Sequence, residues 1–284
     1  MKNYLKIVFL LVVGTAFAQQ ESVYSLYNYN MNAINPAYAG ADGGKLTFLS
    51  RSQWAGVQNA PETQVFILSL PVGEKVGIGL SGVRDQVFIE NATSVFIDFS
   101  YKLQVAEATD LYFGIKAGGL FLDVDTQSLQ TQDQGLSALN EFNPNVGVGA
   151  YLKNDKYFVS LSAPRILNTE RVSNENGVAT TATDKAQFYL SGGYNFDISD
   201  KVLFKPSVLG SFLQGLDPTV TVTAAFNFIE KFDLGVNYRT DDALGGFAVI
   251  NLADWAGFGY AYEANTNDAI QRDSTHEIFV RIGF

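Results

Sequence analysis

The sequence predicts an all-β protein, a transmembrane antiparallel β-barrel of about 14 strands. Several segments alternate between apolar residues and polar or small residues, as in FDLGVNYR at 232–239, and this is the period of a strand with two different faces. Charged residues make up only 17% of the chain, against about 25% in soluble domains. The 22 Phe and 14 Tyr residues supply the aromatic side chains that flank the lipid-facing band of such barrels.

The first 18 residues have the features of a secretory signal peptide. Lys2 and Lys6 precede a short apolar run at 7–13. Ala16-Phe17-Ala18 then forms a small-residue cleavage site. We expect residues 1–18 to be removed, so that the mature chain starts at Gln19. An uncleaved anchor is the alternative, but the apolar run is shorter than the roughly 20 residues that an anchor needs.

Composition excludes several classes of protein. No later stretch has about 18 consecutive apolar residues, so no transmembrane helix is predicted. The absence of Cys excludes a lipoprotein and a disulfide framework. A net charge of −10 is the wrong sign for a nucleic-acid partner, which requires clustered Lys and Arg.

Residues 19–44 are predicted to form a separate N-terminal periplasmic or plug segment. The stretch NYNMNAINPAYAGADGG at 28–44 has too much Asn, Gly and Pro for a helix and no alternation for a strand. Pro36 favours an extended backbone before it, and Gly40 allows a turn. Its amides and tyrosines suit the polar interior of a barrel, so we expect the segment to fold back into the lumen, with Arg51 and Trp54 placed to pin it. The alternative is a disordered periplasmic tail.

Residues 45–284 are predicted to form the barrel, with turns rich in Gly, Pro, Asn and Asp between the strands. Many of the alternating segments run about 9 to 11 residues, which is the length that a tilted strand needs to cross the hydrocarbon layer. A soluble sandwich would show the same alternation, and it is this length that favours the barrel. The predicted strands cover 44–53, 62–70, 75–84, 93–105, 110–122, 145–153, 156–164, 186–197, 201–213, 218–229, 231–240, 243–252, 255–263 and 275–284.

Two connections, near 123–143 and 165–185, are longer and polar. They join strands five to six and seven to eight. Because alternate connections of an up-and-down barrel lie at the same end, both are at one end, opposite the short turns. Long loops of outer-membrane barrels lie outside the cell, so we expect these two connections there.

The chain ends in HEIFVRIGF, in which Ile278, Val280, Ile282 and Phe284 alternate. A terminal aromatic residue on an amphipathic last strand resembles the signal that the barrel-assembly machinery recognises. Phe284 is therefore predicted as an assembly signal; the alternative is an ordinary last strand.

No cofactor, metal or catalytic site is predicted, and the protein is not expected to be an enzyme. The G-x-G-x-x-G match at 77–82 lies inside an alternating strand rather than between a strand and a helix. His276 is the single His, so neither a His-dependent triad nor a zinc site has enough partners. Asp123, Asp125 and Asp133 lack the full ligand spacing of a calcium loop.

Several charged residues fall on the predicted inner faces or rims of the barrel, where buried charges must pair. We expect salt bridges across the lumen, with an ion-selective pore as the alternative. These residues are Arg51, Arg84, Asp98, Asp233, Arg239, Glu277 and Arg281.

Two blocks near the N-terminus, NYNMNAINPAYAG at 28–40 and RSQWAGVQNAPETQ at 51–64, resemble the PorP/SprF family of type IX secretion system membrane proteins. Beyond about residue 65 the resemblance lies in the alternation and the terminal aromatic residue. The residues that carry it, which are also the candidates for the plug and for partner binding, are Asn32, Asn35, Pro36, Ala37, Tyr38, Ala39, Gly40, Arg51, Gln53, Trp54, Gly56, Pro61 and Thr63.

The resemblance implies an outer-membrane barrel of Bacteroidota-type bacteria that works with the type IX machinery, which exports folded cargo such as adhesins, gliding proteins and enzymes. Family members are thought to join the periplasmic ring and peptidoglycan-anchor components, or to assist attachment of one cargo's C-terminal domain. The sequence leaves both roles open. The expected partners are outer-membrane lipid, the barrel-assembly machinery, the ring, anchor or translocon subunits, and a secreted cargo protein.

Two other functions compete with docking. One is an outer-membrane channel or transporter for small solutes, similar in barrel size to fatty-acid transporters. The other is a membrane-embedded hydrolase, which lacks a nucleophile and base set.

Overall fold

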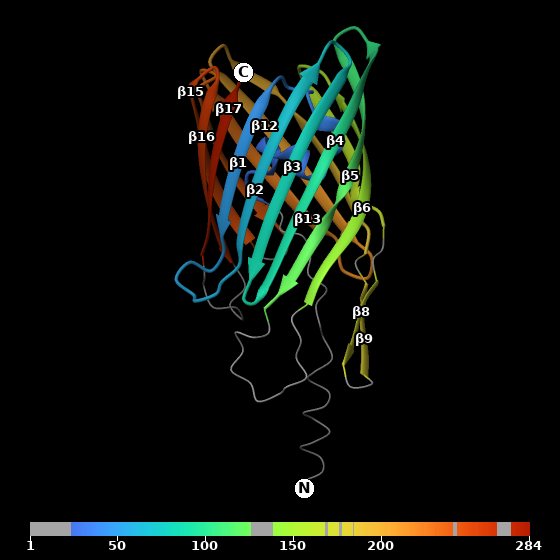
Figure 1. The fold of residues 1–284 in the computed structure, drawn as a ribbon. Coiled ribbons are helices and arrows are strands. Elements are labelled where there is room, and N and C mark those ends of the chain that lie inside the picture. Colours follow the sequence, from blue (N-terminus) through green and yellow to red (C-terminus); the bar gives the residue numbers. More distant parts are fainter. Residues whose placement is uncertain are drawn as a thin grey trace.

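The computed structural model shows a closed antiparallel β-barrel of 14 strands (Figure 1). It describes residues 24–125, 139–167, 170–175, 178–183, 185–240, 243–265 and 274–284. The barrel closes because the first strand, β1 (Lys45–Ser52), pairs with the last, β17 (Ser274–Gly283), and β10 (Gln187–Tyr194) pairs with β12 (Val202–Leu213). The predicted fold class is confirmed.

The remaining strands follow one another in antiparallel order around the barrel. They are β2 (Glu62–Val72), β3 (Val76–Val87), β4 (Glu90–Ala106), β5 (Thr109–Val124), β6 (Leu139–Lys153), β7 (Tyr157–Arg165), β13 (Thr219–Phe228), β14 (Phe232–Arg239), β15 (Ala243–Ala253) and β16 (Ala256–Asn265). A short extra strand, β11 (Phe196–Ser199), extends β10 and is not counted among the 14.

Two regions differ from the predicted pattern. The strand predicted at 186–197 is interrupted at Asn195, so β11 continues β10 along the same partner, β12. The long connection at 165–185 contains a separate hairpin of β8 (Glu170–Glu175) and β9 (Val178–Thr183). This hairpin was missed because its sequence carries no regular alternation of apolar residues. Residues 1–18, Gln19 and Asp133 lie outside the described residues.

The barrel has two different mouths. The short-turn mouth carries the connections 73–75, 107–108, 154–156, 200–201, 229–231 and 254–255. The long-loop mouth carries 53–61, 88–89, 125–138, 166–186, 214–218, 240–242 and 266–273. The C-terminus lies at the short-turn mouth (Figure 1), where the backbone N–H of Phe284 donates to the carbonyl of Gly44 at 3.1 Å.

Side chains of the wall segregate by face as the alternation predicts. In β14, Leu234 and Val236 are exposed on the outside, whereas Asp233 and Asn237 are buried inside. Apolar side chains therefore face lipid and polar ones face the lumen. Arg84 is exposed near the long-loop mouth, on the outward-facing positions of β3 rather than in the lumen.

Three short helices precede the wall, where the sequence predicted none: η1 (Tyr27–Tyr29), α2 (Met31–Ile34) and η2 (Pro36–Tyr38). No helix among the described residues is long and apolar enough to cross a bilayer. We call residues 24–44 the N-terminal segment. Its buried apolar side chains share one cluster with inward-facing residues of the wall. That the segment closes the lumen as a plug stays a prediction.

Candidate functional site

Asn35 fixes the centre of the N-terminal segment. Its Oδ1 accepts from the backbone N–H of Ala37 at 2.9 Å and caps η2, which Pro36 begins. Its Nδ2 donates to Ser160 Oγ at 2.8 Å and to the carbonyl of Ala150 at 3.1 Å. One fully buried amide therefore both starts the helix and attaches it to β6 and β7.

Glycines in the wall let the segment approach the sheet closely. A Cβ on Gly77 of β3 would overlap the carbonyl of Ala39, and one on Gly114 of β5 would overlap the backbone of Ala37. Gly40 has φ of +68° and lies so close to Gly77 that its own Cβ would be 2.8 Å from the Gly77 Cα. These contacts are between backbones, and only Gly leaves room for them.

The end of η2 is held by polar and aromatic contacts. Ser100 Oγ donates to the carbonyl of Ala39 at 2.6 Å, and the N–H of Gly40 donates to Ser69 Oγ at 2.8 Å. The ring of Tyr38 stacks on Tyr151 with centroids 3.7 Å apart and an interplanar angle of 21°. Burial raises the pKa of the Tyr38 hydroxyl well above its usual range, so the ring stays neutral.

A buried cation from the wall meets the backbone of α2. Lys116 Nζ donates to the carbonyls of Asn32 at 3.2 Å and Ala33 at 3.3 Å. It also pairs with Asp98 at 3.3 Å, with both side chains buried. The side-chain amide of Asn32 is oriented so that its N–H group and its oxygen both have partners. In this orientation the N–H group donates to the carbonyl of Tyr38 at 3.1 Å. Lys116 was not predicted as a site residue, although it lies at an inward position of the alternating strand predicted at 110–122.

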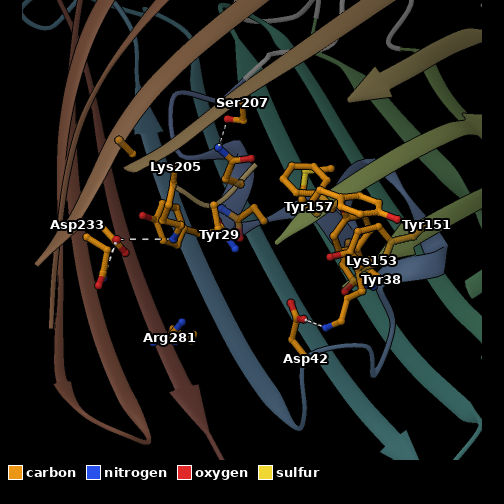
Figure 2. A pocket seen from close by; sticks show the side chains of 18 of the residues that line it. Tyr29, Tyr38, Asp42, Tyr151, Lys153, Tyr157, Lys205, Ser207, Asp233 and Arg281 are labelled. Atoms are coloured by element: carbon orange, nitrogen blue, oxygen red, sulfur yellow. Dashed lines mark hydrogen bonds and ion pairs between the residues drawn. The ribbon is translucent and has the colours of Figure 1, made fainter. Parts of the chain in front are cut away.

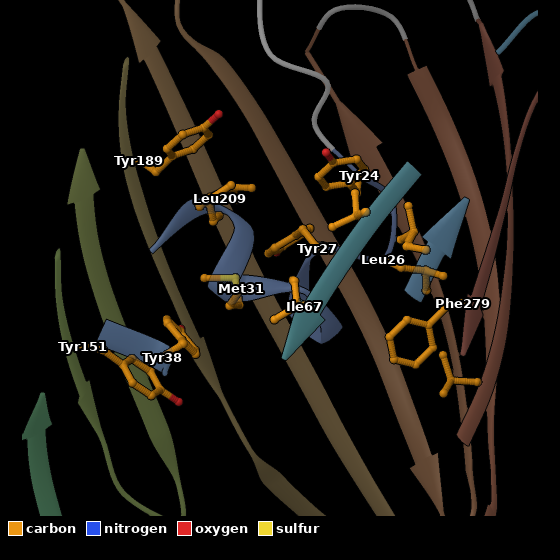
Figure 3. Packing of buried hydrophobic residues seen from close by; sticks show 14 of the residues in the cluster. Tyr24, Leu26, Tyr27, Met31, Tyr38, Ile67, Tyr151, Tyr189, Leu209 and Phe279 are labelled. Atoms are coloured by element: carbon orange, nitrogen blue, oxygen red, sulfur yellow. The ribbon is translucent and has the colours of Figure 1, made fainter. Parts of the chain in front are cut away.

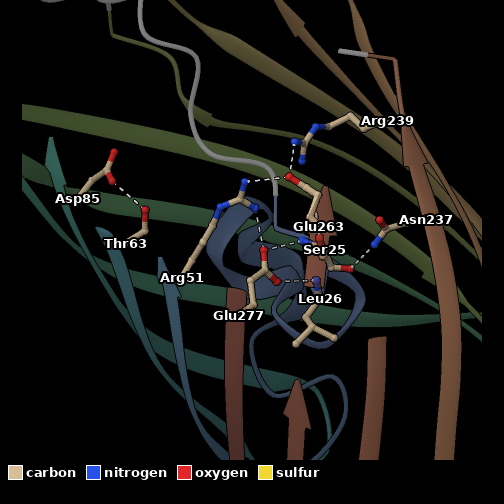
Figure 4. A network of polar contacts seen from close by, with 9 residues as sticks. All are labelled: Ser25, Leu26, Arg51, Thr63, Asp85, Asn237, Arg239, Glu263 and Glu277. Atoms are coloured by element: carbon tan, nitrogen blue, oxygen red, sulfur yellow. Dashed lines mark hydrogen bonds and ion pairs between the residues drawn. The ribbon is translucent and has the colours of Figure 1, made fainter. Parts of the chain in front are cut away.

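A second polar network holds the start of the segment near the long-loop mouth (Figure 4). The carboxylate of Glu277 accepts from the backbone N–H groups of Ser25 at 2.9 Å and Leu26 at 3.0 Å. Arg51 donates to Glu277 at 2.7 Å and to Glu263 at 3.3 Å. All three wall side chains are nearly inaccessible, so Arg51 acts on the segment through the carboxylates that it neutralises.

Apolar side chains of the segment also pack against those of the wall (Figure 3). Leu26, Tyr27 and Met31 of the segment are buried in one cluster with Leu209 and Phe279 of the wall. Such burial contributes about 1.5–3 kcal/mol for each large side chain, before the entropy cost of ordering the segment.

The second sequence block forms the loop at 53–61 of the long-loop mouth. The backbone N–H of Gln53 donates to the carbonyl of Pro61 at 2.9 Å, and Gly56 adopts φ of +97°. The side chain of Trp54 is 41% exposed. Thr63 Oγ1 donates to Asp85 at 2.8 Å. Within this block, Arg51 is the residue that contacts Glu277 and Glu263 in the network near the long-loop mouth.

A cavity of about 520 Å³ opens at the short-turn mouth, and we call it the vestibule (Figure 2). Its inner end is formed by the N-terminal segment, including Tyr29 and Asn30, and its rim includes Asp155 of the turn at 154–156. Lys205 and Arg281 line its sides. Among the residues that the structure describes, no group of three His, Asp or Glu side chains is placed to hold a metal ion.

The model of the family described as type IX secretion system membrane protein PorP/SprF matches residues 16–282. The chain belongs to the PorP/SprF family. The resemblance in the two N-terminal blocks is therefore confirmed at the level of the family, whereas the role of each residue in them stays a prediction. The comparison with curated proteins gives no match.

Solved structures similar to this PorP/SprF protein are outer-membrane barrels. The CymD monoaromatic hydrocarbon channel is similar with a TM-score of 0.50 and 13% identity, over 84% of this chain and 87% of that one. The Acinetobacter baumannii outer membrane protein Omp33 has a TM-score of 0.52 and 9% identity, over 85% and 98%. At these identities the likeness shows the fold alone.

Replacing Asn35 by Asp tests the central anchor of this PorP/SprF protein. The variant loses both donors and turns a carboxylate oxygen toward the carbonyl of Ala150. We expect a loss of about 3 kcal/mol in the free energy of unfolding, measured by urea titration of the detergent-solubilised barrel. Asn59→Asp, in the exposed loop at 53–61, is the matched control and should change little. Equal stability of the two variants would show that the Asn35 amide does not anchor the segment.

Proposed function

We propose that this PorP/SprF protein is a plugged, non-enzymatic barrel that docks other components of type IX secretion at the outer membrane. Membership of the family and the barrel fold support an outer-membrane component of that system. The observation that carries the docking proposal is the N-terminal segment, which is bonded to the inner wall over its length.

The segment is attached on opposite sides of the lumen. Around Asn35 its contacts run to β6 and β7, and around Ser25 they run to β16 and β17. These two pairs of strands are far apart in the order of strands around the barrel. A segment held in this way connects opposite sides of the wall. Its displacement would expose both a buried ion network and a buried apolar cluster.

The short-turn mouth faces the periplasm in this proposal, as it does in other outer-membrane barrels. Ring and peptidoglycan-anchor subunits would then meet the turns and the vestibule, whereas the long loops would face the cell exterior. Candidate partners are these subunits, the translocon, or the C-terminal domain of one cargo protein.

The conductance of the intact protein separates this proposal from a solute channel. If the N-terminal segment plugs the lumen as proposed, the purified barrel should stay closed in a planar lipid bilayer. A steady open pore in the unmodified protein would instead support a channel for small solutes.

Gentle extraction from the native membrane tests docking itself. With an affinity tag inserted in the loop at 53–61, which leaves Phe284 free, the protein should co-purify with ring, anchor or translocon subunits, or with a single adhesin-type cargo. The identity of the partner distinguishes the two roles of the family, which are joining the periplasmic ring and anchor or attaching one cargo protein. Recovery of the barrel alone, together with ion conduction, would contradict the proposal.

A further inference from the structure

The vestibule has the size and chemistry of a binding site. Its volume of about 520 Å³ lies within the range of roughly 300–1,000 Å³ for ligand sites. The N-terminal segment closes its inner end and the short-turn mouth leaves the other end open. A ligand would therefore enter from one side and end against Tyr29, Asn30 and Met31.

The charges of the vestibule favour an anionic group. Lys45 and Lys153 share one carboxylate, that of Asp42, at 3.3 Å and 2.6 Å. Asp233 is paired with Lys205 at 3.6 Å, and the rim also carries the carboxylate of Asp155. Arg281 donates to Asn251 Oδ1 at 2.7 Å and makes no ion pair with any residue that the structure describes.

Arg281 is therefore a guanidinium with donors to spare, held at the side of an open cavity. Arg binds carboxylates through two parallel hydrogen bonds, and this geometry gives both affinity and orientation. The chain as a whole carries a net charge of −10, so a local excess of positive charge inside the vestibule is not a consequence of composition.

The other lining groups suit a peptide backbone. Asn30 lines the vestibule, and both polar atoms of its side chain are buried without a partner among the described residues, so a donor and an acceptor are unused at the inner end of the cavity. Tyr157 lies in the partly exposed lining near the mouth. Tyrosine is enriched where proteins bind polypeptides, because its rigid ring offers contact area and a hydroxyl.

We propose that the vestibule binds an extended polypeptide segment of a periplasmic partner, and that Arg281 holds a carboxylate of that segment. This inference rests on the proposed docking function and names the surface and the chemistry that docking would use. An acidic side chain or a chain terminus would satisfy it equally.

Photocrosslinking in the native outer membrane tests the proposal on the full chain. Tyr157 is replaced by benzoylphenylalanine, and the position outside the barrel at Tyr238, which is 47% exposed, serves as the control. We expect a polypeptide adduct at position 157 and none of the same identity at 238. Mass spectrometry of the adduct should place the crosslink next to an acidic residue or a C-terminus.

Charge variants decide whether Arg281 is the group that binds. Arg281→Gln should lower the yield of that adduct about tenfold, and Arg281→Lys should retain part of it. Lys231→Gln removes a positive charge from the exposed turn at 229–231 and should leave the yield unchanged. The folded state of each variant is checked by its heat-modifiable migration in gels.

Three outcomes would overturn the proposal: no polypeptide adduct at position 157, an adduct with lipid or glycan alone, or an undiminished yield in folded Arg281→Gln. Co-purification from the same membranes separates this failure from that of the docking function. If secretion subunits are recovered without a vestibule adduct, docking stands and uses another surface; if neither is found, both proposals fail.

Discussion

Gly77→Val should open the barrel and Gly82→Val should leave it closed. Both substitutions add the same side chain to the same strand, β3. A Cβ at Gly77 would overlap the carbonyl of Ala39 in the N-terminal segment, whereas a Cβ at Gly82 lies 3.9 Å from its nearest neighbour. The valine at 77 therefore competes with the segment for space, and the valine at 82 points to lipid.

We expect Gly77→Val to displace residues 39–40 from the wall and to show ion conduction in a planar bilayer. Overpacking alone costs about 1–3 kcal/mol, so the thermal midpoint of the variant should also fall. The added β-branched side chain suits a strand in itself, so the Gly82→Val control should keep the conductance and the midpoint of the unmodified protein. Identical behaviour of the two variants would show that the contact with Ala39 is not required.

Arg51→Met should be the most destabilising single charge removal. It leaves the carboxylates of Glu277 and Glu263 buried without the guanidinium between them. Glu263 then keeps the ion pair with Arg239 at 2.8 Å and the hydrogen bond from Ser25 Oγ at 3.0 Å. Removing one partner of a buried ion pair costs about 3–5 kcal/mol. The side chain of Met preserves most of the volume, so the loss would reflect charge rather than a cavity.

Urea titration of the detergent-solubilised protein measures this loss. Arg84→Met is the matched control because Arg84 is exposed on the outer face of β3, and surface charges contribute about 0–1 kcal/mol. The addition of Glu277→Gln to Arg51→Met should recover part of the stability, since it removes one of the unpaired carboxylates. A loss in Arg51→Met no larger than in Arg84→Met would argue that the network near the long-loop mouth does not hold the segment.

The wall of the barrel was predictable from the sequence because lipid imposes a strict rule on it. Outward positions such as Leu234 must be apolar and inward ones such as Asn237 need not be, so the period of two fixes each strand. The rule lapses beyond the hydrocarbon layer, where both faces meet water. For this reason the start of β6 at Leu139 and the hairpin of β8 and β9 were not predicted.

For the interior of the barrel, the sequence predicted the kind of side chain and not the contacts, and the plug itself stays a prediction. Amides, Tyr and Gly at 28–44 indicated a segment suited to a polar lumen, and Arg51 was a candidate to pin it. Local sequence does not show that Arg51 lies beside Glu277, 226 residues away, because that contact exists only when β1 pairs with β17. The match between Gly77 and Ala39 depends in the same way on the closed barrel.

A disulfide between the N-terminal segment and the wall tests the central claim most directly. The chain has no Cys, so a double variant carries no other thiol. The Cβ of Ala39 lies 3.4 Å from the position of a Cβ on Gly79, close to the mean Cβ separation of about 3.8 Å in disulfides. Ala39→Cys with Gly79→Cys should therefore crosslink on oxidation in the outer membrane, and Ala39→Cys with Gly82→Cys should not.

A protease site inserted in the exposed loop at 53–61 lies between the two positions of each pair and makes the crosslink visible. After oxidation and cleavage, we predict that the two fragments of the 39–79 pair stay joined in a non-reducing gel and separate on reduction, while those of the 39–82 pair separate in both conditions. Separation of the 39–79 fragments without reductant would contradict the placement of the N-terminal segment inside the barrel.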